Sequence, residues 1–402
     1  MPEGRQRIKC GFTRKTSAQT GVFAFQRGCT INRLAKILAT TTVLLLLAGC
    51  GQFGYFAHCT KGHLALLAGR TSIPSLIEDP ATPTALRDRL EEVQRIRDFA
   101  TNSLLLPENG SYRSYADLKR AYATWNVVAA PEFSLEPRQW CFPIAGCVTY
   151  RGFFDRELAE NFATGLRRQG LDVYVYGVAA YSTLGWFDDP VLNTFLDQPD
   201  PALAAVIFHE LAHQRLYVPN DTAFSEAFAM TVELLGVEQW LASKDPGSPA
   251  LDYLRAKTRE DDFTLLLDDL RDRLAELYRQ PLPVEEKRRA KQRLLDDFSA
   301  DYRDWKTRWD DYAGYDRWLE IGLNNAKLAS VSTYQRLVPA FRALFALYRS
   351  DFAIFYRQAE YLGSLPPAER GLELEKLRRI FLASQPYPGV PTVQVTKPPE
   401  SL

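Results

Sequence analysis

The sequence has no excess of either charge and very little histidine. Its 402 residues include 49 Lys and Arg and 49 Asp and Glu, so the formal net charge is zero. Nucleic-acid-binding proteins draw much of their affinity from neutralising phosphates and usually carry a basic excess. The composition therefore predicts no nucleic-acid partner. Histidine occurs only four times, so two histidines at a close and regular spacing are informative.

Long apolar runs are also scarce, and the most prominent one lies near the N-terminus. Ile37–Leu47 has about half of the ~20 residues that a membrane-spanning helix needs. Arg33 and Lys36 precede the run and small residues follow it, which is the pattern of a secretory signal peptide. The segment before Arg33 is too long and too polar for the basic part of such a peptide, so the sequence leaves the true start codon open.

A pair of small residues directly before Cys50 resembles the bacterial lipobox. By that resemblance, residues 1–49 are a leader, and Cys50 becomes the lipid-bearing N-terminus of a cell-envelope lipoprotein. The lipid would tether the mature chain to the periplasmic side of a membrane. Gly51, which follows the cysteine, favours the outer membrane.

Two of the six cysteines lie close together in the sequence, Cys141 and Cys147. An oxidising periplasm permits a disulfide between them. A loop this short can strain the geometry of the bridge, so the sequence leaves open whether the disulfide forms.

Periodic patterns predict a mature chain that is mainly helical with a small β-sheet. Apolar residues recur at three- and four-residue steps over 82–103 and 155–169, which predicts two amphipathic helices. A further helix is expected near 115–125, and alternating β-rich residues predict a strand over 172–178. From Pro201 onward nearly all of the chain has helical patterns. The predicted fold class is therefore α+β and predominantly helical.

No linker divides the mature region convincingly, so one domain over 50–385 is predicted. Within it, residues from about 262 to 310 are highly charged, with leucines at heptad-like spacings, and the pattern breaks near 281–283. This predicts a long, solvent-exposed helical hairpin inserted in the domain. The Pro-rich segment 386–402 is expected to be a disordered tail.

The strongest chemical signal is His209-Glu210-Leu-Ala-His213, which lies in a predicted helix from about Asp200 to Tyr217. Because His209 and His213 are four residues apart, both imidazoles project from one helix face and can share one metal ion. Glu210 lies beside them and can reach a metal-bound water without being a ligand, as in zincin peptidases. The helix is apolar nearly all round, and burying these three polar groups is costly unless they have partners.

A catalytic zinc ion needs a third protein ligand, and no histidine follows His213, so a carboxylate must serve. Here the sequence resembles the gluzincin peptidases, in which a second helix offers a glutamate from an Asn-Glu-x-x-Ala-like segment. Ser225–Ala229 fits that pattern with Ser in place of Asn. By that resemblance Glu226 is the third ligand of one zinc ion per chain. Glu233, on the same helix face, either orients a ligand histidine or is itself the ligand.

Several further segments resemble a family of bacterial lipoproteins described as predicted aminopeptidases. The resemblance spans about residues 51–385 and implies a zincin-like metallopeptidase domain that acts on peptides. The segments that carry it are 142–146, 150–154, 181–187, the His209–His213 helix with 224–226, 323–326, Tyr334 and 338–341.

The residues and the resemblance together imply a mechanism. Glu210 would act as general base on a water that zinc activates, and would then pass the proton to the leaving amine. A tyrosine hydroxyl would stabilise the oxyanion beside zinc. Tyr334 is the first choice because it lies in a polar stretch of an otherwise apolar region. Tyr181 and Tyr217 are the alternatives.

Substrate contacts are expected from two segments. The segment 181–187, with Tyr181 and Gly185, precedes the metal helix, as the substrate-binding edge strand does in zincins, or it is a plain sheet edge. Asn324 and Asn325 either hold the substrate backbone or cap a helix. An aminopeptidase also needs an acid for the substrate's free amine, and the candidates are Asp188, Asp189 and Glu233.

Three other functions stay open at this point. The same machinery without an amine-binding acid would be an endopeptidase, and a related zinc hydrolase could act on peptidoglycan peptides. A non-catalytic zinc-containing lipoprotein could bind a protein partner through the hairpin at 262–310. Glu210 argues against the last, because a structural zinc site has no need of a base. Peptide specificity and oligomeric state do not follow from the sequence.

Overall fold

The structure is a computed structural model that describes residues 54–142, 146–244, 248–332 and 337–384. Cys50, the leader and the predicted tail lie outside these residues. The chain divides into two units, Met1–Ala57 and His58–Leu402, and the elements described below belong to the second. They are mostly helices with three small sheets, as the sequence predicts.

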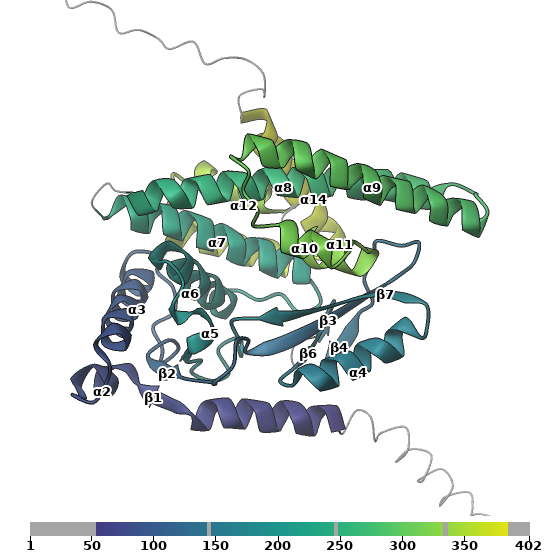
Figure 1. The fold of residues 1–402 in the computed structure, drawn as a ribbon. Helices are drawn as coiled ribbons and strands as arrows, with labels where there is room; N and C mark the ends of the chain where they lie inside the picture. Colours follow the sequence, from purple (N-terminus) through teal and green to yellow (C-terminus); the bar gives the residue numbers. More distant parts are fainter. Residues whose placement is uncertain (1–53, 143–145, 245–247, 333–336, 385–402) are drawn as a thin grey trace, which may run out of the picture. The chain divides into compact units, whose positions relative to one another are not determined.

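The largest β-structure is an antiparallel sheet with the strand order β6-β3-β7. It consists of β3 (Thr124–Pro131), β6 (Arg151–Phe153) and β7 (Leu171–Val178). The predicted strand over 172–178 is confirmed as β7. Figure 1 shows α4 (Arg156–Arg167) on one face of this sheet and α11 (Asn325–Ser332) on the other.

The predicted helix near 115–125 is wrong. The structure places β2 (Ser114–Ala116) at its start and the beginning of β3 at its end. Backbone pairing explains the difference, because β2 pairs with β1 (Arg70–Ser72) and with β8 (Val191–Leu192), and local helical periodicity does not register such long-range partners.

A two-stranded hairpin, β4 (Trp140–Phe142) and β5 (Gly146–Val148), is closed by a disulfide between Cys141 and Cys147. The backbone N–H of Cys147 donates to Oδ1 of Asn220, 2.9 Å away. Gly146 has a φ of 71° and lies so close to Asn220 that an added Cβ would meet its Oδ1 at 2.7 Å. The hairpin therefore packs directly against the turn that contains Asn220.

The main core lies among the remaining helices. Aromatic rings from different helices meet there, with Phe228 stacked on Phe355 at 5.7 Å and Phe224 against Phe341 at 5.1 Å. These helices are α2 (Ile73–Glu78), α3 (Thr84–Asn102), α5 (Asn193–Leu196), α6 (Asp200–Arg215), α7 (Thr222–Ala242), α12 (Val338–Leu347), α13 (Phe352–Ser364) and α14 (Pro367–Ser384).

The predicted helical hairpin is present as α8 (Ser248–Arg279) and α9 (Val284–Arg308), which lie side by side in Figure 1. It breaks where the sequence indicates, but its first helix begins 262 − 248 = 14 residues earlier than predicted, which is about four helical turns. The hairpin is also less exposed than predicted. It has its own core around Phe263 and Phe298, and the short helix α10 (Asp316–Glu320) follows it.

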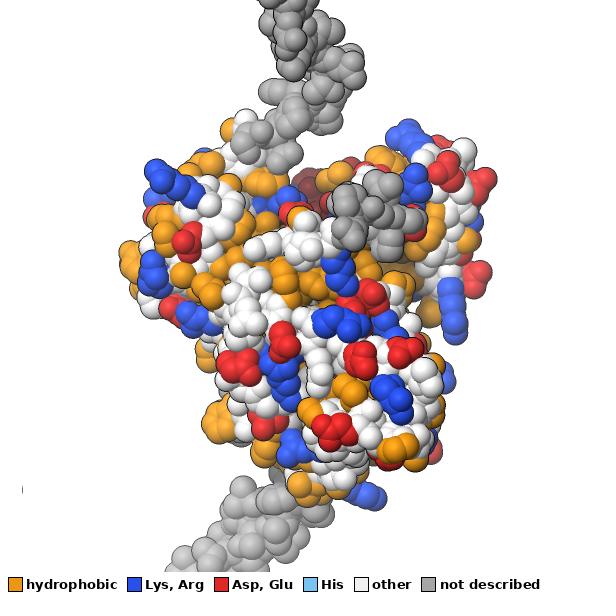
Figure 2. Space-filling view, turned by 90° about the vertical axis from the view of Figure 1, so that its left-hand side faces the viewer, with side chains coloured by type: hydrophobic (Ala, Val, Ile, Leu, Met, Phe, Trp, Pro, Cys, Tyr) orange, Lys and Arg blue, Asp and Glu red, His pale blue; other side chains and the backbone are white. Residues whose placement is uncertain are grey.

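Charged side chains of both signs are interspersed on the face shown in Figure 2, in keeping with the zero net charge. Among the described residues, no helix combines the length and the apolarity needed to cross a membrane.

Candidate metal centre

The site is built on α6 and α7, which pack closely along one another. Gly236 of α7 makes the approach possible, because a Cβ there would lie 2.9 Å from the ring of Phe208 on α6. Asp221 caps α7 by accepting from the N–H of Phe224 at 3.0 Å. The buried Ser225 hydroxyl accepts from the N–H of Val218 at 3.0 Å. These bonds hold the short turn that returns the chain from α6 to α7.

Three side chains predicted as ligands converge between the two helices. Nε2 of His209 lies 3.2 Å from Nε2 of His213. Oε2 of Glu226 lies 3.4 Å from the first of these nitrogens and 3.5 Å from the second. His213 is buried, whereas the side chains of His209 and Glu226 are 20% and 22% exposed. The cluster is therefore open to solvent on one side.

This triangle fits the donor set of a zinc ion. In a tetrahedral site with metal–ligand distances of about 2.0–2.2 Å, neighbouring ligand atoms lie about 3.3–3.6 Å apart. The three distances here are 3.2, 3.4 and 3.5 Å. Two imidazole nitrogens and one carboxylate oxygen are also a common catalytic zinc set. Three protein donors at this spacing leave one position of a tetrahedron for water or substrate.

Glu233 contacts the other nitrogen of the same imidazole. Its Oε2 lies 3.0 Å from Nδ1 of His209. Glu226 and Glu233 are two helical turns apart on one face of α7, so one helix supplies acids to both nitrogens of His209. Burial opposes protonation of His209, but its hydrogen bonds to Glu226 and Glu233 outweigh burial and raise its pKa well above the ordinary value.

Burial and charge also shape the surroundings of Glu210. Asp189 is fully buried. Burial raises the pKa of Asp189 to about 6, hydrogen bonds from Thr183 oppose the rise, and the charge of Glu210 adds to it. Tyr112 is buried as well, and burial followed by the charges of Glu210 and Asp189 raises its pKa well above the ordinary value. An acid and a phenol therefore lie within electrostatic reach of Glu210.

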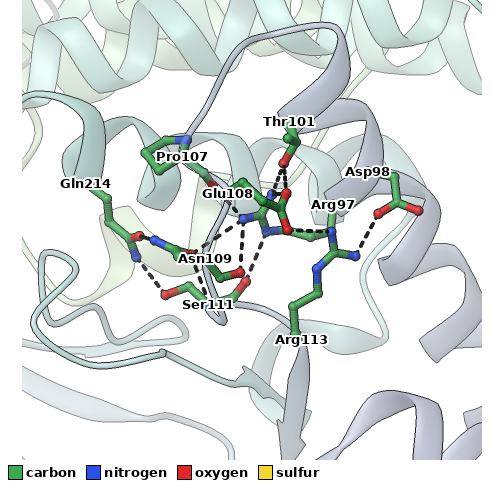
Figure 3. A network of polar contacts seen from close by, with 9 residues as sticks. All are labelled: Arg97, Asp98, Thr101, Pro107, Glu108, Asn109, Ser111, Arg113 and Gln214. Carbon is green, nitrogen blue, oxygen red and sulfur yellow. Dashed lines mark hydrogen bonds and ion pairs between the residues drawn. The ribbon is translucent and has the colours of Figure 1, made fainter.

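Figure 3 shows a polar network that holds the loop before Tyr112 against the end of α6. Gln214 directly follows His213. Its amide oxygen accepts from Asn109 Nδ2 at 2.7 Å, and its amide nitrogen donates to Ser111 Oγ at 3.1 Å. The Ser111 hydroxyl also accepts from the N–H of Asp189 at 3.2 Å. The loop before Tyr112 and the loop that contains Asp189 are thus both linked through Ser111 to Gln214 on α6.

Arg97 of α3 is the buried side chain that holds this network in place. Its side chain is fully buried, and its guanidinium donates to the carbonyl oxygens of Ser111 at 3.0 Å and Pro107 at 2.6 Å. Sequence reasoning missed Arg97, although a signal was present. Arg97 follows Val93 by four residues and so lies on the apolar face of its helix, where an arginine requires partners.

The three tyrosines predicted as oxyanion donors differ in their positions relative to the cluster. Tyr334 lies outside the described residues. Tyr217 lies beside the site, with its ring centroid 6.4 Å from that of His213, and burial and then the charge of Glu226 raise its pKa. Tyr181 packs its ring against Phe154 at 5.1 Å, as a core residue does.

Asn324 and Asn325 use their side chains to hold α11 against the sheet. Asn324 Oδ1 accepts from the N–H of Lys327 at 2.9 Å, and its Nδ2 donates to the carbonyl of Val173 at 3.2 Å. Asn325 is fully buried and donates to the carbonyl oxygens of Pro131 and Glu132. The capping alternative describes Asn324, whereas the Asn325 amide binds the chain at the end of β3.

The segment 181–187 is a loop, so the predicted substrate-binding edge strand and the alternative of a plain sheet edge are both wrong. Gly185 has a φ of 81°, and a Cβ there would lie 3.5 Å from the side chain of Gln214. The loop therefore borders the metal helix. Of the acids predicted for amine binding, Asp189 is buried and accepts from Thr183, and Glu233 contacts His209. Asp188 is exposed.

A helix pair that brings two histidines and a glutamate together, with a second glutamate in the same motif, defines a candidate metal centre. The model of a family described as "Putative aminopeptidase" matches residues 54–374, and the chain belongs to that family. The match includes every residue of the cluster. No curated protein and no solved structure matches the chain.

Proposed function

We propose that this protein is a zinc-dependent peptidase, and most simply an aminopeptidase. The observation that carries the proposal is the triangle formed by His209, His213 and Glu226, whose sides match the ligand spacing of tetrahedral zinc. Membership of the aminopeptidase family supports peptide hydrolysis as the reaction. Glu233 supports the same proposal, because a carboxylate on the far nitrogen of a ligand histidine sets its tautomer and increases its basicity.

Zinc held by these three residues would supply Lewis-acid chemistry, which lowers the pKa of water and polarises a carbonyl group. Glu210 is the side chain that removes a proton from the attacking water and transfers it to the leaving amine. Asp189 and Tyr112 are buried and lie within electrostatic reach of Glu210. Of the predicted oxyanion donors that the structure describes, Tyr217 is the one whose ring lies beside a ligand histidine, and we assign it to the developing oxyanion.

Release of single residues from the N-terminus requires an acid that holds the free amine. Glu233 remains 27% exposed while it contacts His209, and Asp188 is exposed. Asp189 is excluded from this role because it is fully buried and accepts three hydrogen bonds from Thr183 and Ser182. An endopeptidase is the second candidate, and it is favoured by the engagement of two of the three acids with protein groups.

We further propose that the mature protein is a lipoprotein attached through Cys50 to the periplasmic face of the envelope, with the outer membrane favoured by Gly51. The signal-peptide and lipobox patterns in the sequence support this proposal.

Metal content and peptide cleavage, measured on the same preparation, test the enzymatic proposal. The expected result is one zinc per chain and stepwise N-terminal trimming in a mixed peptide library read by mass spectrometry. Internal cuts would make the protein an endopeptidase. Glu226→Ala should lose zinc, whereas Glu238→Ala, on the same helix and 46% exposed, should retain it. A wild-type protein without zinc would overturn the proposal.

A further inference from the structure

The helix over 58–68 docks on the body of the protein through one face. Nε2 of His58 accepts from the N–H of Phe154 at 3.0 Å. Gly62 lies so close to Phe154 that a Cβ would meet its ring at 2.2 Å, and Leu66 is buried. These three positions are four residues apart, so they form a single stripe on the helix.

The opposite face of this helix is exposed and almost uncharged. Its side chains are Thr60, Lys61, Leu64, Ala65 and Ala68, and Leu64 is 58% exposed. Three of these five side chains, Leu64, Ala65 and Ala68, are apolar. A helix face in contact with water alone normally carries more polar and charged side chains.

A loop tip extends the apolar surface beside this helix. The ring of Phe187 lies 4.7 Å from that of His63, between centroids, so the loop and the helix are in contact. Trp186 is 67% exposed and Phe187 is 50% exposed. We call Leu64, Trp186 and Phe187 the apolar patch. Exposed tryptophan beside aliphatic residues is typical of surfaces that enter the interfacial region of a bilayer.

The distribution of charge along the chain also favours contact with a bilayer. No Asp or Glu occurs between Cys50 and Glu78, and the charged residues in that interval are Lys61 and Arg70. Anionic lipids attract basic residues and repel acidic ones near the membrane surface. This segment is therefore suited to lie against a bilayer. The loop with Trp186 and Phe187 continues into the exposed Asp188, whose backbone carbonyl accepts from Arg70 at 2.9 Å.

The tether restricts where the patch can be. Cys50 precedes His58 by 58 − 50 = 8 residues, which span at most about 28 Å when fully extended. A lipid on Cys50 would therefore keep the bilayer surface within that distance of the docked helix. A short tether greatly raises the effective concentration of bilayer at the patch.

We propose that the apolar patch rests in the headgroup region of a phospholipid bilayer and, with the lipid on Cys50, holds the catalytic unit in one orientation. The proposal rests on the lipid attachment proposed above and not on zinc chemistry. Because the loop that carries Trp186 also borders Gln214 on the metal helix, this contact would place the site close to the membrane surface.

Quenching of tryptophan by brominated lipid tests the proposal. The full chain, processed in a bacterial host, is reconstituted into vesicles of phosphatidylethanolamine and phosphatidylglycerol that contain brominated phosphatidylcholine. Trp186 is the one exposed tryptophan among the described residues. We expect strong quenching that Trp186→Phe removes and that the control Trp305→Phe, on α9, leaves in place.

A second variant tests the patch without removing the probe. The double substitution Leu64→Ser and Phe187→Ser should lower the quenching of Trp186 by about twofold or more, while Leu265→Ser, at an equally exposed position on α8, should not. Lipidation is verified on the N-terminal peptide by mass spectrometry, and zinc is measured on the same sample.

Four results would overturn the proposal. A lipidated chain whose Trp186 is not quenched would show that the anchor acts without the patch. If the wild type were a dimer in detergent and Trp186→Phe converted it to a monomer, the patch would be assigned to contact with a second copy of this chain. If the double substitution Leu64→Ser and Phe187→Ser raised the KM for peptides and left the quenching of Trp186 unchanged, the patch would be assigned to substrate binding. A chain without lipid would remove both this proposal and the anchor, while zinc content and cleavage would report separately on the peptidase.

Discussion

Oε2 of Glu233 lies 3.0 Å from Nδ1 of His209, on the nitrogen that does not face Glu226. This contact fixes which nitrogen of His209 is available for a metal ion, because a carboxylate at Nδ1 holds the proton there and leaves the lone pair of Nε2 directed at the cluster. Glu233 therefore prepares the site without being part of the triangle.

Glu233→Ala should weaken zinc binding by about 10- to 100-fold, the usual cost of removing such a supporting carboxylate. Zinc affinity is measured by competition with a chromophoric chelator. Glu238→Ala is the matched control, since Glu238 lies on the same helix and its side chain is 46% exposed. An unchanged zinc affinity in Glu233→Ala would show that the contact has no influence on the metal.

Glu210→Gln should retain zinc and lose turnover. Glutamine has nearly the same shape but cannot accept a proton, so general-base catalysis worth about 10²- to 10⁴-fold is removed. The measurement combines zinc stoichiometry with the kcat of peptide hydrolysis. Full activity in this variant would refute the assignment of Glu210 as the base.

Asp189→Asn should change how stability depends on pH. The pKa of Asp189 is raised from 3.8 to about 6 in the folded protein, mainly by burial. Between these values the folded state binds more protons than the unfolded state, so this group makes stability fall as pH rises from about 4 to 6. Above pH 6 the penalty is complete, at roughly 3 kcal/mol.

Asparagine does not titrate, so the difference in free energy of unfolding between variant and wild type should move in favour of the variant from pH 4 to pH 7. Urea unfolding of the zinc-free proteins at several pH values measures this difference. A difference that stays constant over the whole range would contradict the prediction. Comparing the two proteins at each pH cancels the titration of the groups that do not interact with Asp189.

Arg97→Met should destabilise the protein and slow catalysis while zinc stays bound. The buried guanidinium satisfies the carbonyls of Pro107 and Ser111, and leaving them without donors costs roughly 3 kcal/mol or more. Loosening this loop releases Asn109 and Ser111 from Gln214, so kcat should fall as well. Arg303→Met, at an exposed position on α9, should match wild type in both measurements. Equal free energies of unfolding for the two variants would show that the hydrogen bonds of Arg97 do not stabilise the protein.

Much of the candidate metal centre could be predicted from the sequence, because several of the relevant distances lie within single helices. Four-residue spacing places His209 and His213 on one face in any α-helix, and seven-residue spacing does the same for Glu226 and Glu233. The helical class, the break in the hairpin and the strand over 172–178 also follow from local periodicity.

Only the tertiary structure decides which glutamate completes the cluster. That choice depends on the position of α7 relative to α6 along the helix axis. Contacts such as Gly236 against Phe208 set this position. The buried face of the hairpin and the anchoring of the loop by Arg97 depend on partners far away in the sequence as well. Local patterns specify the faces of each element, whereas the distances between elements come from side-chain packing across the core, which no local pattern contains.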